Sequence, residues 1–129
     1  MKKNNPALFN ELNNFILELN SLKKKGAFEV ACGECHVSRH VLSKHFSKID
    51  LLDRCPISLQ HAQQLKEQLS CIGNIYDSQM QEFAWDQKWN CIVFRFCVGY
   101  PNDDQLVEIL RKAKGCLDGR MNSLKRGAT

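Results

Sequence analysis

The stretch Val30-Ala-Cys-Gly-Glu-Cys-His-Val-Ser-Arg39 supports two unrelated interpretations of this chain. It contains Cys32-Gly33-Glu34-Cys35-His36, the C-x-x-C-H spacing at which two thiols attach a haem and the adjacent imidazole ligates its iron. The same residues follow a short apolar segment and precede a predicted helix. In that context they form a glycine-containing turn of the kind that holds nucleotide-like cofactors. A zinc site would need a fourth ligand such as His40, and adjacent Cys and His residues are poorly placed to share one ion.

Length and composition indicate one soluble domain. The chain has 129 residues, of which 43% are hydrophobic and 25% charged, and it has no uninterrupted apolar run long enough to span a bilayer. We expect no membrane insertion. The start of the chain lacks the apolar core of a signal peptide, and its seven cysteines, an odd number, fit a reducing compartment. We therefore expect a cytoplasmic or nuclear protein. The net charge of +4 comes from scattered Lys and Arg residues, which is weak evidence for nucleic-acid binding.

Hydrophobic periodicity predicts alternating helices and strands. Apolar residues at helical spacing predict an amphipathic N-terminal helix over residues 7–24. The other predicted elements are strands over residues 27–31, 49–52, 71–76 and 91–98, and helices over residues 38–46, 56–69 and 102–117. The strand over 91–98 is almost continuously apolar, as is typical of a strand covered on both faces. Short strands that alternate with helices predict an α/β fold with a parallel sheet.

A second stretch is specific to a known family: Asn90-Cys-Ile-Val-Phe-Arg-Phe-Cys-Val-Gly-Tyr-Pro-Asn-Asp-Asp-Gln-Leu-Val-Glu-Ile-Leu-Arg-Lys-Ala-Lys-Gly-Cys-Leu117. It resembles the protein α-N-terminal methyltransferases, which use S-adenosylmethionine to methylate the amino terminus of other proteins. Their counterpart is a strand of the type D-V-I-W-I-Q-W-V-I-G-H, then a T-D-Q-x-L turn and a helix ending L-R-R-x-K-x-x-L. Gln79-Met-Gln-Glu-Phe83 is similar to the family's G-L-Q-D-F, and Val30–Arg39 aligns with its D-C-G-A-G-I-G-R.

The resemblance covers roughly residues 5 to 117 and implies an architecture. It implies an α/β fold with an incomplete doubly wound, Rossmann-like parallel sheet of strand order 3-2-1-4 and flanking helices. The expected organisation is a single methyltransferase-like domain over residues 1–129, with the N-terminal helix over 7–24, a cofactor-binding core over 27–117 and a polar tail over 118–129 that carries no strong strand.

The resemblance also implies S-adenosylmethionine as cofactor. Gly33 matches the family's first glycine, Asp53 matches the acid that binds the ribose hydroxyls, and Met80 with Gln81 matches the pair that lies along the adenine. Arg95 occupies the position of a glutamine near the cofactor. The candidate cofactor-binding residues are Gly33, Ser38, Arg39, Asp53, Arg54, Met80, Gln81 and Arg95.

For the substrate, the resemblance implies the amino-terminal peptide of another protein. Phe96 takes the position of a tryptophan that lines the peptide pocket, and Tyr100 takes that of a histidine. Asp103 matches an acidic residue that helps to deprotonate the substrate amine, which must lose its proton before it can attack a methyl group. Asp103 is equally suited to cap a helix.

Several positions depart from the family. Cys35 and Val37 replace its second and third glycines, and a Cβ at these positions is expected to intrude on the cofactor. Ala31 replaces the acid of the first strand. The arginine that holds the cofactor carboxylate falls on Ser38, unless a one-residue shift lets Arg39 serve.

The sequence leaves open whether the chain is an active enzyme. Without the family's later strands, residues 91–98 are expected to form an exposed edge of the sheet, through which a non-catalytic relative could pair with a protein partner or with itself. A c-type haem protein that uses Cys32, Cys35 and His36 is a further alternative.

Overall fold

The computed structural model describes the backbone of residues 13–19, 25–96, 101–117 and 122–126, and the side chains of residues 25–95 and 101–117. Its strands are β1 (Asn13–Leu19), β2 (Gly26–Val30), β3 (Lys48–Asp53), β4 (Ile72–Asp77), β5 (Cys91–Phe96) and β6 (Asn122–Arg126). Its helices are α2 (His36–His40), the short 3-10 helix η1 (Leu42–Lys44), α3 (Pro56–Gln68) and α4 (Asp103–Gly115). In this part of the chain, no helix is long and apolar enough to cross a membrane.

The six strands form one sheet in the order β4-β3-β2-β5-β1-β6. Neighbouring strands from β4 to β5 pair in parallel, while β1 pairs antiparallel with both β5 and β6. When the parallel strands β2, β3, β4 and β5 are numbered 1 to 4 along the chain, they lie in the order 3-2-1-4. This order confirms the predicted α/β topology.

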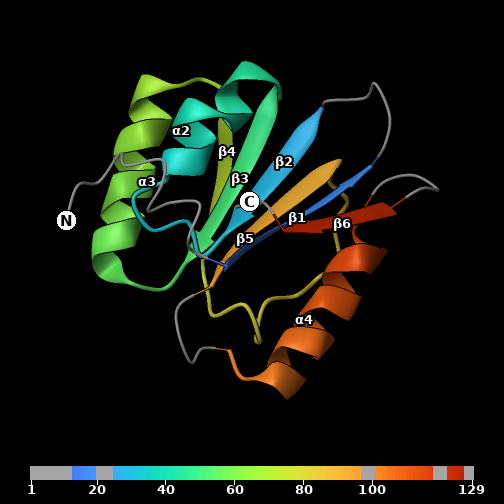
Figure 1. Cartoon of the computed structure of the whole chain (residues 1–129). Coiled ribbons are helices and arrows are strands. Elements are labelled where there is room, and N and C mark those ends of the chain that lie inside the picture. The colour runs from blue at the N-terminus through green and yellow to red at the C-terminus, as the bar shows by residue number, and fades with distance from the viewer. Residues whose placement is uncertain (1–12, 20–24, 97–100, 118–121, 127–129) are drawn as a thin grey trace.

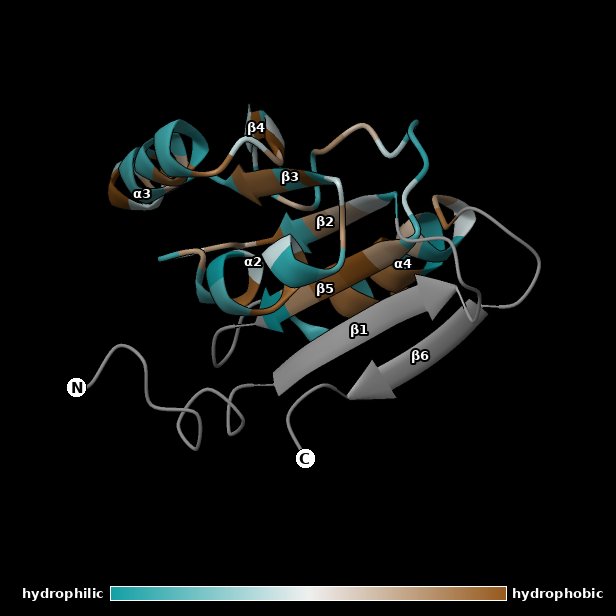
Figure 2. Ribbon diagram, turned by 90° about the horizontal axis from the view of Figure 1, so that it is seen from above, coloured by the Kyte–Doolittle hydropathy of each residue, from teal (hydrophilic) through white to brown (hydrophobic). Residues whose placement is uncertain are grey.

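Helices cover both faces of the sheet, with α2 and α3 on one side and α4 on the other (Figure 1). Side chains along a strand alternate between the two faces. Ala27 and Val93 accordingly pack in the cluster that includes residues of α2 and α3, whereas Phe28 and Phe94 pack in the cluster that includes residues of α4. Strand β5 lies between these layers and is largely hydrophobic (Figure 2), which explains its continuous apolar sequence.

The predicted N-terminal helix is wrong over Asn13–Leu19, which form β1. Residues 7–12 and 20–24 of that prediction lie outside the described residues. The segment Phe15-Ile-Leu17 is a short apolar run, and such a run fits a strand as well as a helix. Pairing in the sheet decides between them, because β1 takes up the hydrogen-bonding edge of β5 that β2 does not use.

This pairing also corrects the prediction that residues 91–98 form an exposed edge. Strand β5 lies between β2 and β1, with Phe15 opposite Phe94. The prediction that residues 118–129 carry no strong strand is wrong as well, because Asn122–Arg126 form β6 against β1. The edges of the sheet are β4 and β6.

The remaining elements follow the prediction closely, with one exception. The helix predicted over residues 38–46 is divided into α2 and η1. Pro56 begins α3, where its missing N–H costs no hydrogen bond. The predicted third strand forms β4 despite its Gly73 and Asn74.

Candidate functional site

The turn between β2 and α2 has a left-handed backbone at alternate residues. The φ angle is +61° at Ala31, +56° at Gly33 and +64° at Cys35. Glycine adopts this conformation freely, whereas a residue with a Cβ does so at a cost of roughly 1 kcal/mol. Cys35 therefore adopts a backbone conformation that glycine favours.

The side chains that replace the family's glycines are buried in the core. Cys35 is fully buried and Val37 is nearly so, and both belong to the hydrophobic cluster under α2 and α3. Their Cβ atoms lead into the core, so the expected intrusion on the cofactor does not follow from these two substitutions. Gly33, in contrast, is only half-buried.

Asp53, at the end of β3, ties this turn to the neighbouring strand. Its Oδ2 accepts a hydrogen bond of 2.9 Å from the backbone N–H of Gly33. Its Oδ1 accepts bonds from the backbone N–H groups of Arg54, at 2.7 Å, and Cys55, at 3.0 Å. Asp53 thus stabilises the strand-to-helix loop. Two carboxylate oxygens offer about four acceptor positions, so the half-buried side chain keeps capacity for one further donor.

Arg95 reaches the same turn from β5. Its guanidinium Nη1 lies 3.4 Å from the position that a Cβ on Gly33 would occupy. Both residues are half-buried, so the positive charge lies directly beside the open side of the turn. Gly33, Asp53 and Arg95 are the predicted site residues that the structure brings together.

Glu29 is a component of this region that the sequence analysis did not identify. It lies on β2, is fully buried, and its Oε1 accepts hydrogen bonds from the Oγ of Ser38, at 2.6 Å, and from the Ser38 N–H, at 3.1 Å. Burial raises the pKa of Glu29 to about 7, against the opposing effects of the Ser38 hydrogen bonds and the charge of Arg95. Its Oε2 has no hydrogen-bond partner among the described residues. The signal in the sequence was a carboxylate inside an apolar strand.

The polar groups of Ser38 and Arg39 are hydrogen-bonded to other residues. Ser38 is fully buried and its hydroxyl is bonded to Glu29. The Nη1 of Arg39 donates a 2.9 Å hydrogen bond to Gln68 on α3. Arg54 is exposed and forms a 3.4 Å pair with Glu82, which solvent screens.

The haem and zinc interpretations find no support in the geometry. Cys32 and Cys35 are both fully buried, and the pKa of the Cys32 thiol is raised by its hydrogen bond to Cys35 and by burial. Thiols that attach a haem must be reachable. His36 Nε2 lies 2.8 Å from a carboxylate oxygen of Glu34. Among the described residues, no group of three or more His, Cys, Asp or Glu side chains is placed to hold a metal ion.

The segment after β4 packs on the α4 face of the sheet through aromatic rings. The ring of Phe28 stacks on Trp89 at a centroid distance of 4.3 Å and lies 5.2 Å from Phe83. Met80 is buried in this cluster, where its carbonyl oxygen accepts a 3.3 Å hydrogen bond from Trp85. Gln81 is half-buried. Met80 and Gln81 thus lie beside this cluster of aromatic rings, and the Met80 side chain is part of the core.

Asp103 begins α4 without serving as its cap. Asn102 is the cap: its Oδ1 accepts a 2.9 Å bond from the Gln105 N–H, and Gln105 Oε1 accepts a 3.1 Å bond from the Asn102 N–H. The Asp103 side chain is exposed. Tyr100 and the Phe96 side chain lie outside the described residues.

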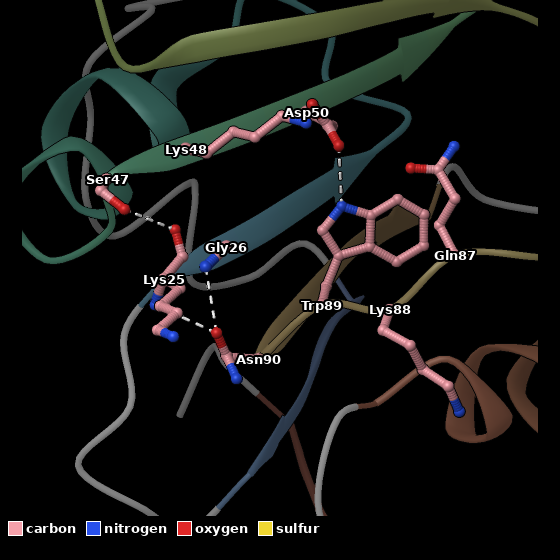
Figure 3. Close-up of a pocket in the computed structure, with 9 residues that line it drawn as sticks. All are labelled: Lys25, Gly26, Ser47, Lys48, Asp50, Gln87, Lys88, Trp89 and Asn90. Carbon is pink, nitrogen blue, oxygen red and sulfur yellow. Dashed lines mark hydrogen bonds between the residues drawn. The ribbon is translucent and has the colours of Figure 1, made fainter.

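A separate cavity of about 520 Å³ lies at the opposite end of the parallel strands, where β2 and β3 begin (Figure 3). Most of its polar groups form hydrogen bonds within the protein. Asp50 accepts hydrogen bonds from Trp89 Nε1, at 2.9 Å, and from the Asn74 N–H, at 2.7 Å. Asn90 Oδ1 accepts two backbone N–H groups at 3.0 Å. The cavity is therefore distinct from the turn at the carboxyl ends of the strands.

Comparison with known families agrees with this geometry. The family of AdoMet-dependent proline di-methyltransferases matches residues 7–122. The chain belongs to this family. Its cofactor is therefore S-adenosylmethionine, and the turn with Gly33 and Asp53 lies where an open α/β sheet binds its ligand, outside the carboxyl ends of the strands.

Solved methyltransferase structures share the fold at low sequence identity. A SAM-dependent methyltransferase from Leishmania major is 16% identical, with a TM-score of 0.63 over 77% of this chain and 40% of that chain. DesVI from Streptomyces venezuelae is 21% identical, with a TM-score of 0.60 over 74% of this chain and 39% of that chain. DhpI, solved with SAM, is 15% identical, with a TM-score of 0.62 over 88% of this chain and 48% of that chain. The chain spans less than half the length of these three relatives.

Proposed function

We propose that this chain binds S-adenosylmethionine at the carboxyl ends of β2 and β3 and transfers its methyl group to the terminal amine of a protein chain. The observation that carries the proposal is the 2.9 Å hydrogen bond from the Gly33 N–H to Asp53. It holds together the glycine turn and the strand-end carboxylate of a dinucleotide-type site.

The residues present fit the cofactor. The remaining acceptor capacity of Asp53 suits a ribose hydroxyl, and the Gly33 turn lets the backbone approach the methionine part. Gln81, which is half-buried beside the buried Met80, supplies an amide group for the adenine. Bound S-adenosylmethionine would supply an activated methyl group, and the protein has to align an amine with it and keep that amine unprotonated.

Asp103 is our candidate for the proton acceptor. It is an exposed carboxylate at the start of α4, the helix that follows β5, and the cap hydrogen bonds are made by its neighbour Asn102. A base in this position would hold the amine of a peptide substrate and take its proton. Phe96 and Tyr100 are proposed to contact that peptide.

Because the chain belongs to a family of proline di-methyltransferases, a peptide with a free N-terminal proline is the first substrate to test. Isothermal titration with S-adenosylhomocysteine, followed by mass spectrometry of a Pro-Pro-Lys peptide incubated with S-adenosylmethionine, would test the proposal. We expect binding of the cofactor product and methylation of the free amine. The same peptide with an acetylated terminus is the matched control and should stay unmodified. Failure of the cofactor product to bind would refute the proposal.

A non-catalytic relative is the second candidate. Ala31 and Ser38 favour it, because the family's acid and arginine are missing there and Ser38 is bonded to Glu29. Such a protein would bind the cofactor without methylating any terminal amine, and it would contact a protein partner in another way than through β5, which is paired on both edges.

A further inference from the structure

The cofactor has an α-carboxylate that needs a positive partner, and Ser38 on α2 cannot provide one. Ser38 has no charge and is buried against Glu29, and Arg39 is bonded to Gln68 on α3. If the chain binds S-adenosylmethionine as proposed, a cation at another position has to meet this carboxylate.

Arg95 lies where such a cation is needed. Parallel pairing of β2 with β5 places Val30 opposite Phe94, so Arg95 follows at the level of Ala31, the first residue of the turn. Its Nη1 lies at contact distance, 3.4 Å, from the Cβ position of Gly33. A guanidinium has five N–H donors, so it can bind a carboxylate and keep other contacts.

Glu29 provides a counter-charge for this arginine from inside the core. Val93 and Arg95 are two residues apart on β5 and share a face of the sheet, and Val93 pairs with Glu29. Arg95 and Glu29 interact electrostatically, and the Oε2 of Glu29 has no hydrogen-bond partner among residues that the structure describes. The charged groups around Glu29 are Arg95 and Asp53, with Ser38 as its hydrogen-bond donor.

We infer that Arg95 binds the α-carboxylate of S-adenosylmethionine, in place of the arginine that the family carries at the Ser38 position. This inference rests on the proposed function. It means that the positive charge has moved from the start of α2 to the end of β5, on the opposite side of the same turn.

The test compares two ligands that differ at this group. S-adenosylhomocysteine carries the α-carboxylate and α-amine, and 5′-methylthioadenosine lacks both. Arg95→Gln restores the family's glutamine. It should lower the affinity for S-adenosylhomocysteine about 10- to 100-fold, the loss typical of a charged hydrogen-bonding pair, and leave the affinity for methylthioadenosine unchanged. Arg111→Gln, at an exposed arginine of α4 that pairs with Glu108, is the matched control and should change neither affinity. Arg95→Lys should recover part of the loss, because it keeps the charge without the planar fork.

The outcomes separate the two proposals. If wild-type protein binds neither ligand, the proposed function fails and the Arg95 inference fails with it. If it binds both and Arg95→Gln changes nothing, or weakens both equally, the Arg95 inference is overturned while cofactor binding stands. If circular dichroism shows that Arg95→Gln does not fold, the test uses wild-type protein instead and measures its binding of decarboxylated S-adenosylmethionine. Wild-type protein must then bind it at least about 10-fold more weakly than S-adenosylmethionine, and equal affinities would overturn the inference.

Discussion

The hydroxyl of Ser38 donates a 2.6 Å hydrogen bond to Glu29, and neither side chain is exposed to solvent. The bond joins the middle of β2 to α2. It keeps one oxygen of a buried carboxyl group satisfied and places a titratable group beneath the turn that begins with Ala31.

Glu29→Gln should remove a pH dependence of stability. The folded-state pKa of Glu29 is about 7 and its ordinary value is 4.5, so the folded protein holds this proton more tightly than the unfolded chain. The associated stability is fully present below pH 4.5 and is lost as pH rises through 7. The ionised group then costs about 3 kcal/mol, from 1.36 kcal/mol per pKa unit. Urea unfolding at pH 8 should show the variant to be more stable than wild type, with near equality at pH 4.5. Equal pH profiles would contradict the pKa assignment.

Asp53→Ala should weaken both the fold and cofactor binding. The Gly33 N–H would lose its 2.9 Å acceptor in a half-buried position, which costs about 1–2 kcal/mol in the free energy of unfolding. We also expect loss of most S-adenosylhomocysteine binding in isothermal titration. Asp77→Ala, at the end of the adjacent strand β4, is the control and should leave the affinity unchanged.

Gly33→Ala and Ala31→Gly should change stability in opposite directions. Gly33 has a φ of +56° and its new Cβ would lie 3.4 Å from Arg95, so the substitution should cost about 1–2 kcal/mol. Ala31 has a φ of +61°, and glycine there should relieve strain and add up to roughly 1 kcal/mol. Thermal unfolding measures both. A stabilising Gly33→Ala would show that the turn has another backbone conformation.

Asp103→Asn should lower the rate of amine methylation about 100-fold while S-adenosylhomocysteine binds as before, because proton removal is affected and cofactor contacts are not. Asp104→Asn is a close control, since both carboxylates lie in the exposed first turn of α4. A steady-state assay with the Pro-Pro-Lys peptide would compare them. Equal losses in both variants would assign the effect to the helix terminus and not to a base.

Cys55 should be the most reactive of the cysteines that the structure describes. It is exposed, and hydrogen bonds from the backbone N–H groups of Ser58 and Ile57 lower its pKa. Burial protects Cys32, whose pKa is raised. A brief treatment with a limiting thiol reagent, followed by peptide mapping, should find Cys55 modified first and Cys32 last. Cys55→Ser provides the control, in which the fast phase should disappear.

The sequence pattern was sufficient to predict the parallel sheet, and the family resemblance implied its strand order. The continuous apolar segment at β5 and the alternation of strands with helices are local signals that survive in the fold. The segment Phe15-Ile-Leu17 shows the limit, because its periodicity fits a helix while its backbone pairs with β5, far away in the sequence. Secondary structure there is decided by a distant partner.

The site was predictable only in part for a similar reason. Gly33 and Asp53 follow from a motif and from the end of a strand. The role of Glu29 depends on contact with Ser38 nine residues later, and that of Arg95 depends on strand register. The burial of the Cys35 and Val37 side chains depends on the backbone conformation of the turn. These are properties of the assembled sheet.

The pairing of β1 has a consequence for synthesis on the ribosome. Asn13 pairs with Phe96, and Phe15 pairs with Arg126, so both neighbours of this early strand are translated long after it. Loops of this length close slowly, and a nascent chain has to keep β1 from other partners until then. Folding of the sheet should therefore complete only after translation of β6, and chaperone binding to nascent chains that have not yet reached this strand is the expected cellular signature.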